Sequence, residues 1–342
     1  MRTRTEWWKH ALRFSVLFLW TGAAGAQEGP RSGGDFSNNM QPAKVPEGVI
    51  LVKGAWASAS DAKTPLPEGG RVSGGTYVNA YFGLSYPLPA GWTQKYDGPP
   101  PSDSGYYVLA QVAPAAAADG SLLGSILVVA QDLFFTPAPA ANALELLDYG
   151  KQRLGDQYKL ERGPEALAVA GRTFVRFDYG APAAELHWHV LATEIRCHVV
   201  KFVFTSRDSS LTEALIGDLA NLKLPVEAGA VAGNGGGDAP VCIKDYANEE
   251  NVIERSDPYF AERRFNTVLV RIIIDRQGRV KHIHFLSAFP DQAKAIQDAL
   301  AEWRFRPYLR DGKPVEVETG IVFGNLRRTS APAASSADTV NE

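Results

Sequence analysis

The clearest alternation of apolar and polar positions lies in the C-terminal part of the chain. "NTVLVRIIID" (266–275) and "RVKHIHFL" (279–286) alternate as strands do, and "RQG" between them supplies a turn. "DQAKAIQDALAEWRF" (291–305) has a helical period, and we expect Asp291 to cap this helix. One face of the helix carries Ile296, Ala299, Leu300 and Trp303. The pattern predicts a hairpin followed by a helix whose Trp303 anchors the core.

After this helix the chain turns and ends in a further strand. Asp311 and Gly312 form a favourable tight-turn dipeptide, because glycine adopts positive φ without steric cost. "KPVEVETGIVFGN" (313–325) then has apolar residues at Val315, Val317, Ile321 and Phe323. The predicted topology is ββαβ with a small three-stranded sheet.

Residues 72–226 combine several strand-like runs with two helical ones. "YYVLAQVAP" (106–114) and "SLLGSILVVAQDLFF" (121–135) are rich in strand formers, and "ELHWHVLATEIRCHVVKFVFTS" (185–206) is long enough for two antiparallel strands. "ANALELLDYGKQRLG" (141–155) and "SLTEALIGDLANLKL" (210–224) have helical periods, with Asp208 and Ser209 available as caps of the second. We expect an α+β domain in which helices cover one large antiparallel sheet as an α/β/α sandwich.

Composition changes mark the boundaries between these regions. Gly, Pro, Ser and Ala dominate the region after the N-terminus, in which "VILVKGAW" (49–56) is an apolar island that we expect to dock as a strand. The expected order is a signal peptide (1–26), a flexible lead-in (27–71), an α+β domain (72–226), a Gly-rich linker (227–240), a ββαβ domain (241–328) and a disordered tail (329–342).

The N-terminus indicates export. The apolar run "FSVLFLWTGAAGA" follows four basic residues, Arg2, Arg4, Lys9 and Arg13, and ends in the small residues Ala24–Ala26. This is the arrangement of a cleavable secretory signal, and the apolar run is too short to span a membrane comfortably as an uncleaved anchor. We therefore expect a periplasmic protein.

Composition and motifs exclude several functional classes. The chain has 342 residues and a net charge of −3, which gives no reason to expect nucleic acid or an anionic membrane as partner. The sequence contains no nucleophile elbow, metalloprotease helix, C-x-x-C pair or phosphate loop. We expect a non-enzymatic protein without a cofactor.

The two cysteines, Cys197 and Cys242, would both lie in an oxidising compartment. One hypothesis is that they form a disulfide that fastens the two domains together. Sequence alone does not bring their Cα atoms within bridging distance, so two free thiols are the alternative.

Histidines are the only candidate metal ligands that recur with a regular spacing. His187 with His189, and His282 with His284, each form an H-x-H pair whose imidazoles share one strand face, as Zn²⁺ or Cu²⁺ sites require. Alternatively, Ile283 and Phe285 form the buried set and leave the second pair on a solvated face. No acidic or cysteine ligand lies at close spacing, so we expect no metal.

The C-terminal region resembles the C-terminal domain of TonB-type energy transducers. The matching pieces are "DPYFAERR" (257–264), "VRIIIDRQGRV" (270–280), "AIQDALAEWRFRPYLRDGKPV" (295–315) and "VETGIVF" (317–323). This resemblance implies a sheet that receives an extended segment of an outer-membrane transporter as an added strand. Full transducers also have a membrane anchor and a Pro-rich spacer, whereas here a globular domain precedes the module. We therefore expect the binding role without coupling to an inner-membrane motor.

Residues 72–226 resemble the PsbP-like family of α/β/α sandwiches, through "YFGLSYPLPAGW" (81–92), a helix in the middle and a closing helix. This resemblance implies a binding or assembly domain, and fold analogy transfers no specific function.

Together these observations predict an adaptor that binds an envelope or outer-membrane protein by strand addition, or that pairs with a second copy of itself. A small-ligand or lipid-binding accessory protein, with the ligand held in the N-terminal sandwich, is the alternative. The expected recognition edge consists of Val315, Glu316, Val317, Glu318, Thr319, Gly320, Ile321, Val322 and Phe323.

Overall fold

The computed structural model describes residues 49–51, 67, 70–96, 104–115, 124–137, 140–225, 240–260, 267–286 and 288–324. The expected signal peptide and C-terminal tail lie outside the described residues, as do most of the lead-in and the linker up to residue 239. Within the described part, no helix is both long enough and apolar enough to cross a membrane.

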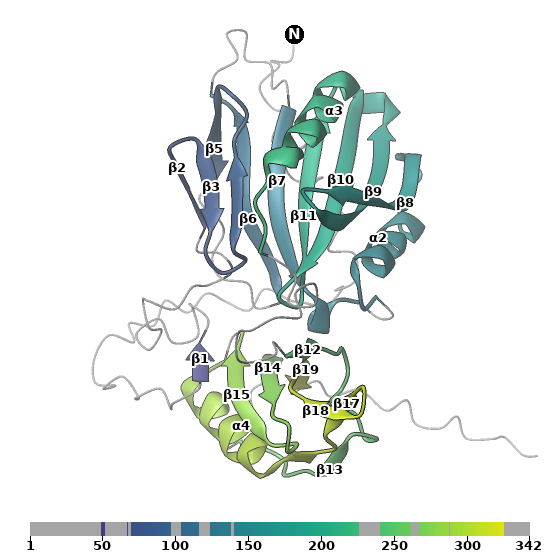
Figure 1. The fold of residues 1–342 in the computed structure, drawn as a ribbon. Coiled ribbons are helices and arrows are strands. Elements are labelled where there is room, and N and C mark those ends of the chain that lie inside the picture. Colours follow the sequence, from purple (N-terminus) through teal and green to yellow (C-terminus); the bar gives the residue numbers. More distant parts are fainter. Residues whose placement is uncertain are drawn as a thin grey trace, which may run out of the picture.

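A seven-stranded antiparallel sheet forms the N-terminal domain (Figure 1), in the order β5-β6-β7-β11-β10-β9-β8. The predicted pair of antiparallel strands within residues 185–206 is confirmed, with a hairpin turn at Arg196 and Cys197. The strands are β5 (Trp92–Tyr96), β6 (Tyr106–Pro114), β7 (Gly124–Asp132), β8 (Lys159–Val169), β9 (Arg172–Ala181), β10 (Leu186–Ile195) and β11 (His198–Ser206).

Both faces of this sheet are covered. Phe174 and its neighbour Val175 on β9 belong to two different core clusters, because successive strand residues point to opposite faces. One cluster includes residues of α3 and of a three-stranded sheet, and the other includes residues of α2. The covering elements are β2 (Arg71–Ser73), β3 (Thr76–Asn79), β4 (Leu84–Pro87), η1 (Leu133–Phe135), α2 (Ala143–Gln152), α3 (Ser209–Asp218) and η3 (Leu219–Asn221), and η2 (Pro182–Ala184) connects β9 to β10. As expected, the Asp208 side chain caps α3.

The C-terminal domain contains the predicted hairpin, helix and returning strand. These are β14 (Val268–Ile274), β15 (Val280–Phe285), α4 (Pro290–Glu302) and β19 (Val317–Phe323). The predicted sheet of three strands is wrong, because the sheet has five strands in the order β1-β15-β14-β19-β12. The two additional strands, β1 (Val49–Leu51) and β12 (Val241–Cys242), come from outside the hairpin–helix–strand unit and occupy its two edges. The prediction of an α+β chain is confirmed.

Trp303 and the Asp311–Gly312 turn lie where the sequence pattern predicts them. Trp303 is 2% exposed and its Nε1 donates to the backbone oxygen of Ser256 at 2.7 Å, so its core position is confirmed. Asp311 and Gly312 have φ values of 52° and 75° at the turn between β17 (Tyr308–Arg310) and β18 (Lys313–Val315). A second small ribbon pairs β13 (Val252–Glu254) with β16 (Arg304–Phe305).

Asp291 does not cap α4. The cap residue is Phe289, and Pro290 starts the helix with a fixed φ and no N–H to satisfy. The Gln292 side chain accepts a hydrogen bond from the Phe289 N–H at 3.2 Å, while Asp291 lies in the first turn near the positive end of the helix dipole.

Candidate functional site

The edges of the C-terminal sheet differ from the sequence-based prediction. Val315–Phe323 was expected to form one edge strand, but Val315 belongs to the separate β17–β18 ribbon. β19 pairs with β14 along its whole length and with β12 at Val317 and Glu318, so these two residues lie inside the sheet, whereas Thr319–Phe323 have a described strand partner on one side only. Val317 is 1% exposed. Its replacement by proline would disturb the core, and it is therefore no clean test of binding.

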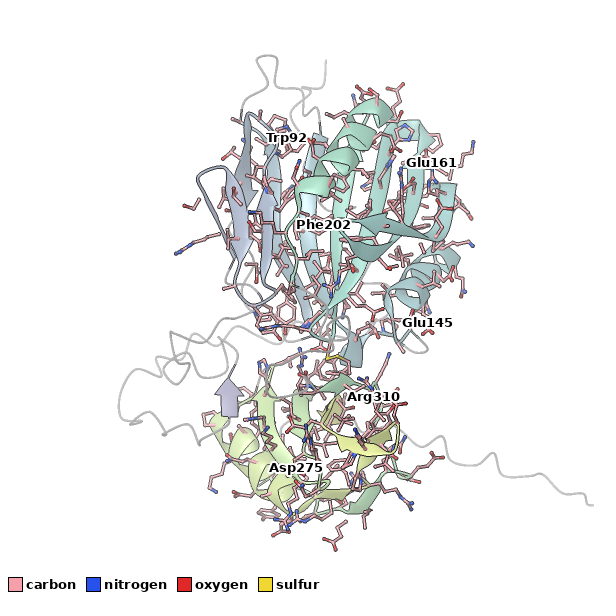
Figure 2. The ribbon with its side chains drawn as sticks, viewed as in Figure 1. Trp92, Glu145, Glu161, Phe202, Asp275 and Arg310 are labelled. Carbon is pink, nitrogen blue, oxygen red and sulfur yellow. A yellow bond between two sulfur atoms is a disulfide. The ribbon has the colours of Figure 1, made fainter. Side chains whose placement is uncertain are left out.

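The strand that covers β19 is fixed covalently to the other domain. Cys242 of β12 forms a disulfide with Cys197 of the β10–β11 turn, with the two Cα atoms 5.5 Å apart. Figure 2 shows this bond between the two domains. The structure thus contains the disulfide that the sequence left open. Because the bond ties β12 to the N-terminal domain, this edge of the sheet is covered at Val317 and Glu318 by a strand that is held covalently.

At the opposite edge, the described residues show strand pairing between β1 and β15. β1 runs parallel to β15, with Val49, Ile50 and Leu51 in register with Ile283, His284 and Phe285. The expectation that residues 49–56 contain a docking strand is correct for these three residues. A parallel pair of this length is weakly held compared with the long antiparallel ladder between β14 and β19.

Arg271 of β14 lies at the centre of the domain interface. Its guanidinium is 3.2 Å from Asp132 of the N-terminal domain and 2.6 Å from Glu318 of its own sheet. Nη1 also lies 3.0 Å from Nε2 of His198, whose Nδ1 is 2.6 Å from the backbone oxygen of Arg196. His198 therefore donates through Nδ1 and accepts from Arg271 through Nε2. All of Asp132, His198 and Arg271 are at most 2% exposed.

Burial sets the protonation of these groups. Burial raises the pKa of Asp132 to about 6, against the opposing effect of the Arg271 charge. Burial, with the Arg271 charge second, lowers the pKa of His198 well below its usual value. The interface is therefore a carboxylate–guanidinium pair beside a neutral imidazole, and it fixes the orientation of the C-terminal sheet.

Two further contacts close the interface. Lys244, which follows β12, donates to the backbone oxygens of Thr136 and Ala140 at 2.8 and 2.6 Å, and burial lowers its pKa. A Cβ atom on Gly320 of β19 would lie 2.5 Å from Cβ of Phe134, so only glycine permits this close approach. The sheet face opposite α4 is therefore packed against the N-terminal domain.

For His284, this packing corrects the alternative in which the second histidine pair occupies a solvated face. Burial, with Arg271 second, lowers the pKa of His284 to about 3. Its buried Nε2 has no hydrogen-bond partner in the part of the chain that the structure describes. The alternation of apolar and polar residues correctly predicted that Ile283 and Phe285 are buried. It could not show that another domain covers the opposite face of the strand.

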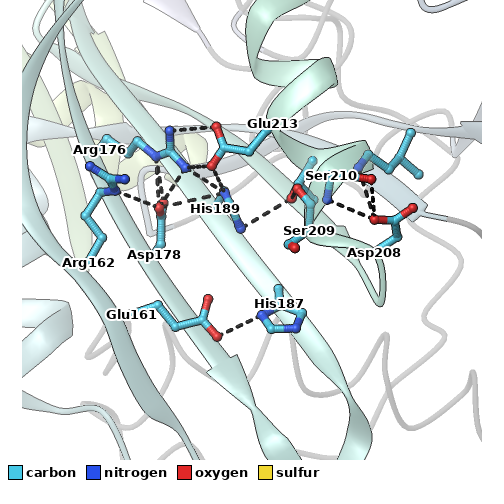
Figure 3. A network of polar contacts seen from close by, with 12 residues as sticks. Glu161, Arg162, Arg176, Asp178, His187, His189, Asp208, Ser209, Ser210 and Glu213 are labelled. Carbon is cyan, nitrogen blue, oxygen red and sulfur yellow. Dashed lines mark hydrogen bonds and ion pairs between the residues drawn. The ribbon is translucent and has the colours of Figure 1, made fainter.

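His189 of the first histidine pair belongs to an ion-pair cluster on the N-terminal sheet (Figure 3). Asp178, His189 and Glu213 offer three ligand atoms within 4.8 Å of one another. The Arg176 guanidinium already lies among them, at 3.0 Å from Asp178 and 2.9 Å from His189 Nδ1, and it also pairs with Glu213. Arg176 supplies the positive charge that a metal ion would bring, so this set favours structural ion pairing.

His187 and His189 do not converge on one point. His187 pairs with Glu161 at 2.7 Å, whereas His189 is held by Arg176 and lies 3.3 Å from the Thr212 hydroxyl. Burial lowers the pKa of His189. Because a guanidinium only donates, Nδ1 of His189 accepts from Arg176. The cluster connects β9, β10 and α3.

Sequence reasoning missed the residues that join the domains: Asp132, Arg271, Lys244 and Glu318 in its contact with Arg271. The one available signal was a charged residue, Arg271, inside the strongly apolar run "VLVRIII". A charge in such a run indicates a buried ion pair, since an unpaired charge there is costly.

Comparison with known proteins supports the resemblance of the C-terminal unit. Residues 261–324 match the family model for the Gram-negative bacterial TonB protein C-terminal domain. No curated protein sequence is significantly similar to the chain.

Solved structures similar to part of the chain include the following three. The solution structure of cyanobacterial PsbP (CyanoP) from Synechocystis sp. PCC 6803 is 15% identical, covers 49% of this chain and 99% of its own, and has a TM-score of 0.32. LpqN of Mycobacterium tuberculosis, described as involved in cell envelope biogenesis, is 11% identical, with coverages of 40% and 78% and a TM-score of 0.25. A protein from Bacteroides thetaiotaomicron is 12% identical, with coverages of 47% and 50% and a TM-score of 0.23.

Proposed function

We propose that this chain is a periplasmic, non-enzymatic adaptor that binds an extended segment of an envelope protein as an added strand of its C-terminal sheet. The observation that carries the proposal is that this sheet already holds two strands from outside the region that matches the TonB C-terminal model. Edge strands offer unpaired N–H and C=O groups, and addition of a peptide strand satisfies them.

The N-terminal domain serves as the support that presents this sheet. The disulfide between Cys197 and Cys242 and the buried Arg271–Asp132 pair hold the two domains in one orientation. A disulfide of this kind persists in an oxidising compartment, which agrees with a periplasmic location. The adaptor therefore binds its partner on one domain and keeps the other at a fixed position relative to it.

A photo-crosslinking amino acid tests this function in the intact chain. Placed at Lys281, an exposed position on β15 just before the segment paired with β1, it should crosslink to an extended segment of an envelope protein, identified by mass spectrometry. The matched control position is Leu160 on β8, which is 40% exposed on an edge strand of the other sheet. Equal crosslinking at both positions, or none at Lys281, would contradict the proposal. Light scattering separates pairing between two copies of the chain from binding of a different protein.

A further inference from the structure

The two edges of the C-terminal sheet are not equally available to a partner, and the following inference rests on the proposed function. β12 is tied by its Cys242 to Cys197, and the chain beyond it is held by Lys244 in the N-terminal domain. Displacement of β12 would require breaking a covalent bond. β1 contains no cysteine, and it pairs with β15 through three residues in parallel register. Of the two added strands, β1 is therefore the one that can be exchanged without breaking a covalent bond, and it lies on the edge of β15.

The register with β15 specifies the chemistry of an occupant. Residues directly opposite one another in a sheet share a face. Ile283 and Phe285 are 8% and 1% exposed and belong to the core cluster that packs against α4. Positions opposite them, which Val49 and Leu51 hold, therefore adjoin an apolar core and favour apolar residues. An occupant should be an extended segment with apolar residues at its first and third positions.

The middle position of the occupant lies opposite His284. The imidazole of His284 is neutral, and its buried Nε2 has no hydrogen-bond partner among the described residues. Ile50, which is in register with His284, has no side-chain hydrogen-bonding group. A serine or threonine hydroxyl both donates and accepts, so it satisfies either tautomer of the ring. A partner segment with a hydroxyl here gains a bond that β1 does not make.

We infer that the edge of β15 is the partner-binding surface, that β1 occupies it within the same chain as a built-in competitor, and that the partner is an extended segment with an apolar–hydroxyl–apolar pattern running parallel to β15. Partner binding then exchanges one added strand for another. The segment Ile283–Phe285 of β15 stays paired in both states, so it is not exposed as an unpaired edge between encounters.

The strength of this competition follows from the tether. A strand linked to its own acceptor acts at an effective concentration on the order of 1 mM. If the isolated segment binds with a Kd on the order of 100 μM, a tethered copy weakens an external segment about tenfold. Removal of β1 as a strand should therefore tighten binding of an external segment about tenfold.

The first experiment uses the chain's own segment as the probe. A fluorescent peptide of residues 47–54, "EGVILVKG", is titrated into the full chain and into a variant with Val49→Gly, Ile50→Ser and Leu51→Gly. The variant should bind the peptide at one site about tenfold more tightly than the full chain does. The control variant carries Val45→Gly and Ala55→Gly, which flank β1, and should bind as the full chain does.

Equal affinities of the full chain and the β1 variant would overturn the competition. Absence of binding to the β1 variant, with its disulfide shown to be intact by mass spectrometry, would overturn the assignment of the edge. Crosslinks from the bound peptide should fall on residues 281–286. Crosslinks confined to another element would also overturn the assignment of the edge.

The second experiment tests the middle position. A peptide with Ile50→Thr should bind the β1 variant about fivefold more tightly than the unchanged peptide, the factor expected for satisfying one buried polar group. The advantage should disappear when His284→Leu is added to that variant. Equal affinity of the two peptides, or an advantage that survives His284→Leu, would overturn the assigned hydroxyl.

Failure of this inference is distinguishable from failure of the adaptor function. An envelope partner captured equally by the full chain and the β1 variant leaves the adaptor function standing and removes the competition. In the opposite case, peptide binding follows the expected order while no envelope partner is crosslinked from Lys281. That result leaves the competition standing and removes the adaptor function.

Discussion

Replacement of Arg271 by methionine should separate the interface from the rest of the fold. Methionine keeps an unbranched side chain of similar length and removes the charge. The change eliminates the ion pairs with Asp132 and Glu318 and the contact between Nη1 and His198. The carboxylate of Asp132, which is 0% exposed, then stays buried without the positive charge of Arg271.

The structure sets the size of the effect. For the 3.2 Å separation between Arg271 Nη1 and Asp132 Oδ2, Coulomb's law with an effective dielectric constant of about 20 gives about 5 kcal/mol. Loss of one partner of a buried pair costs about 3–5 kcal/mol, because the other charge stays buried and unpaired. We expect Arg271→Met to lower the free energy of unfolding by about 3–5 kcal/mol at pH 7.

Urea unfolding followed by tryptophan fluorescence measures this loss. Arg279→Met, at an exposed arginine of the same domain, is the matched control and should change stability by less than about 0.5 kcal/mol. Adding Asp132→Asn to Arg271→Met should recover part of the loss, because a neutral amide needs no cation. The reasoning is refuted if Arg271→Met costs less than about 1 kcal/mol, or if Asp132→Asn restores nothing in that background.

Four further predictions concern single features. The pKa of Asp132 is about 6 in the folded protein and 3.8 ordinarily. Its protonation therefore stabilises the fold fully below about pH 4, and this contribution, on the order of 3 kcal/mol, is lost as the pH rises through 6. Asp132→Asn should flatten this pH dependence in urea titrations from pH 4 to 7. Replacing Cys197 and Cys242 by serine should cost about 4 kcal/mol for a loop of 45 residues, and reductant should then leave the stability of the variant unchanged. Trp303→Ala should cost about 3–5 kcal/mol in the same assay, and a loss below about 1 kcal/mol would argue against its core role. Glu213→Gln should cost less than about 1 kcal/mol, because that carboxylate is 52% exposed and screened by solvent.

Local features of the C-terminal domain could be predicted from sequence because short-range pattern determines them. The helical period placed Trp303 on the buried side of α4, and Asp311–Gly312 fixed the turn between β17 and β18. Both depend on residues within one or two turns of chain. The same locality explains why the strand pair joined at Cys197 was predicted correctly.

Features that depend on distant segments could not be predicted in this way. Whether β19 is an edge strand depends on β12, which comes from before the hairpin, and whether β15 is one depends on β1, which comes from before the N-terminal domain. Alternation separates two faces of a strand and does not show what covers each face. His284 was therefore compatible with a solvated face, although the N-terminal domain and Arg271 lie on that side.

Amide hydrogen exchange of the full chain, with and without a bound partner segment, tests the central claim most directly. The account predicts that amides of Lys281–Phe285 stay protected in both states, while those of Val49–Leu51 lose protection when the segment binds. Protection of Val49–Leu51 that persists in the bound state would contradict the account, because β1 and the partner segment cannot pair with the same edge of β15 at the same time.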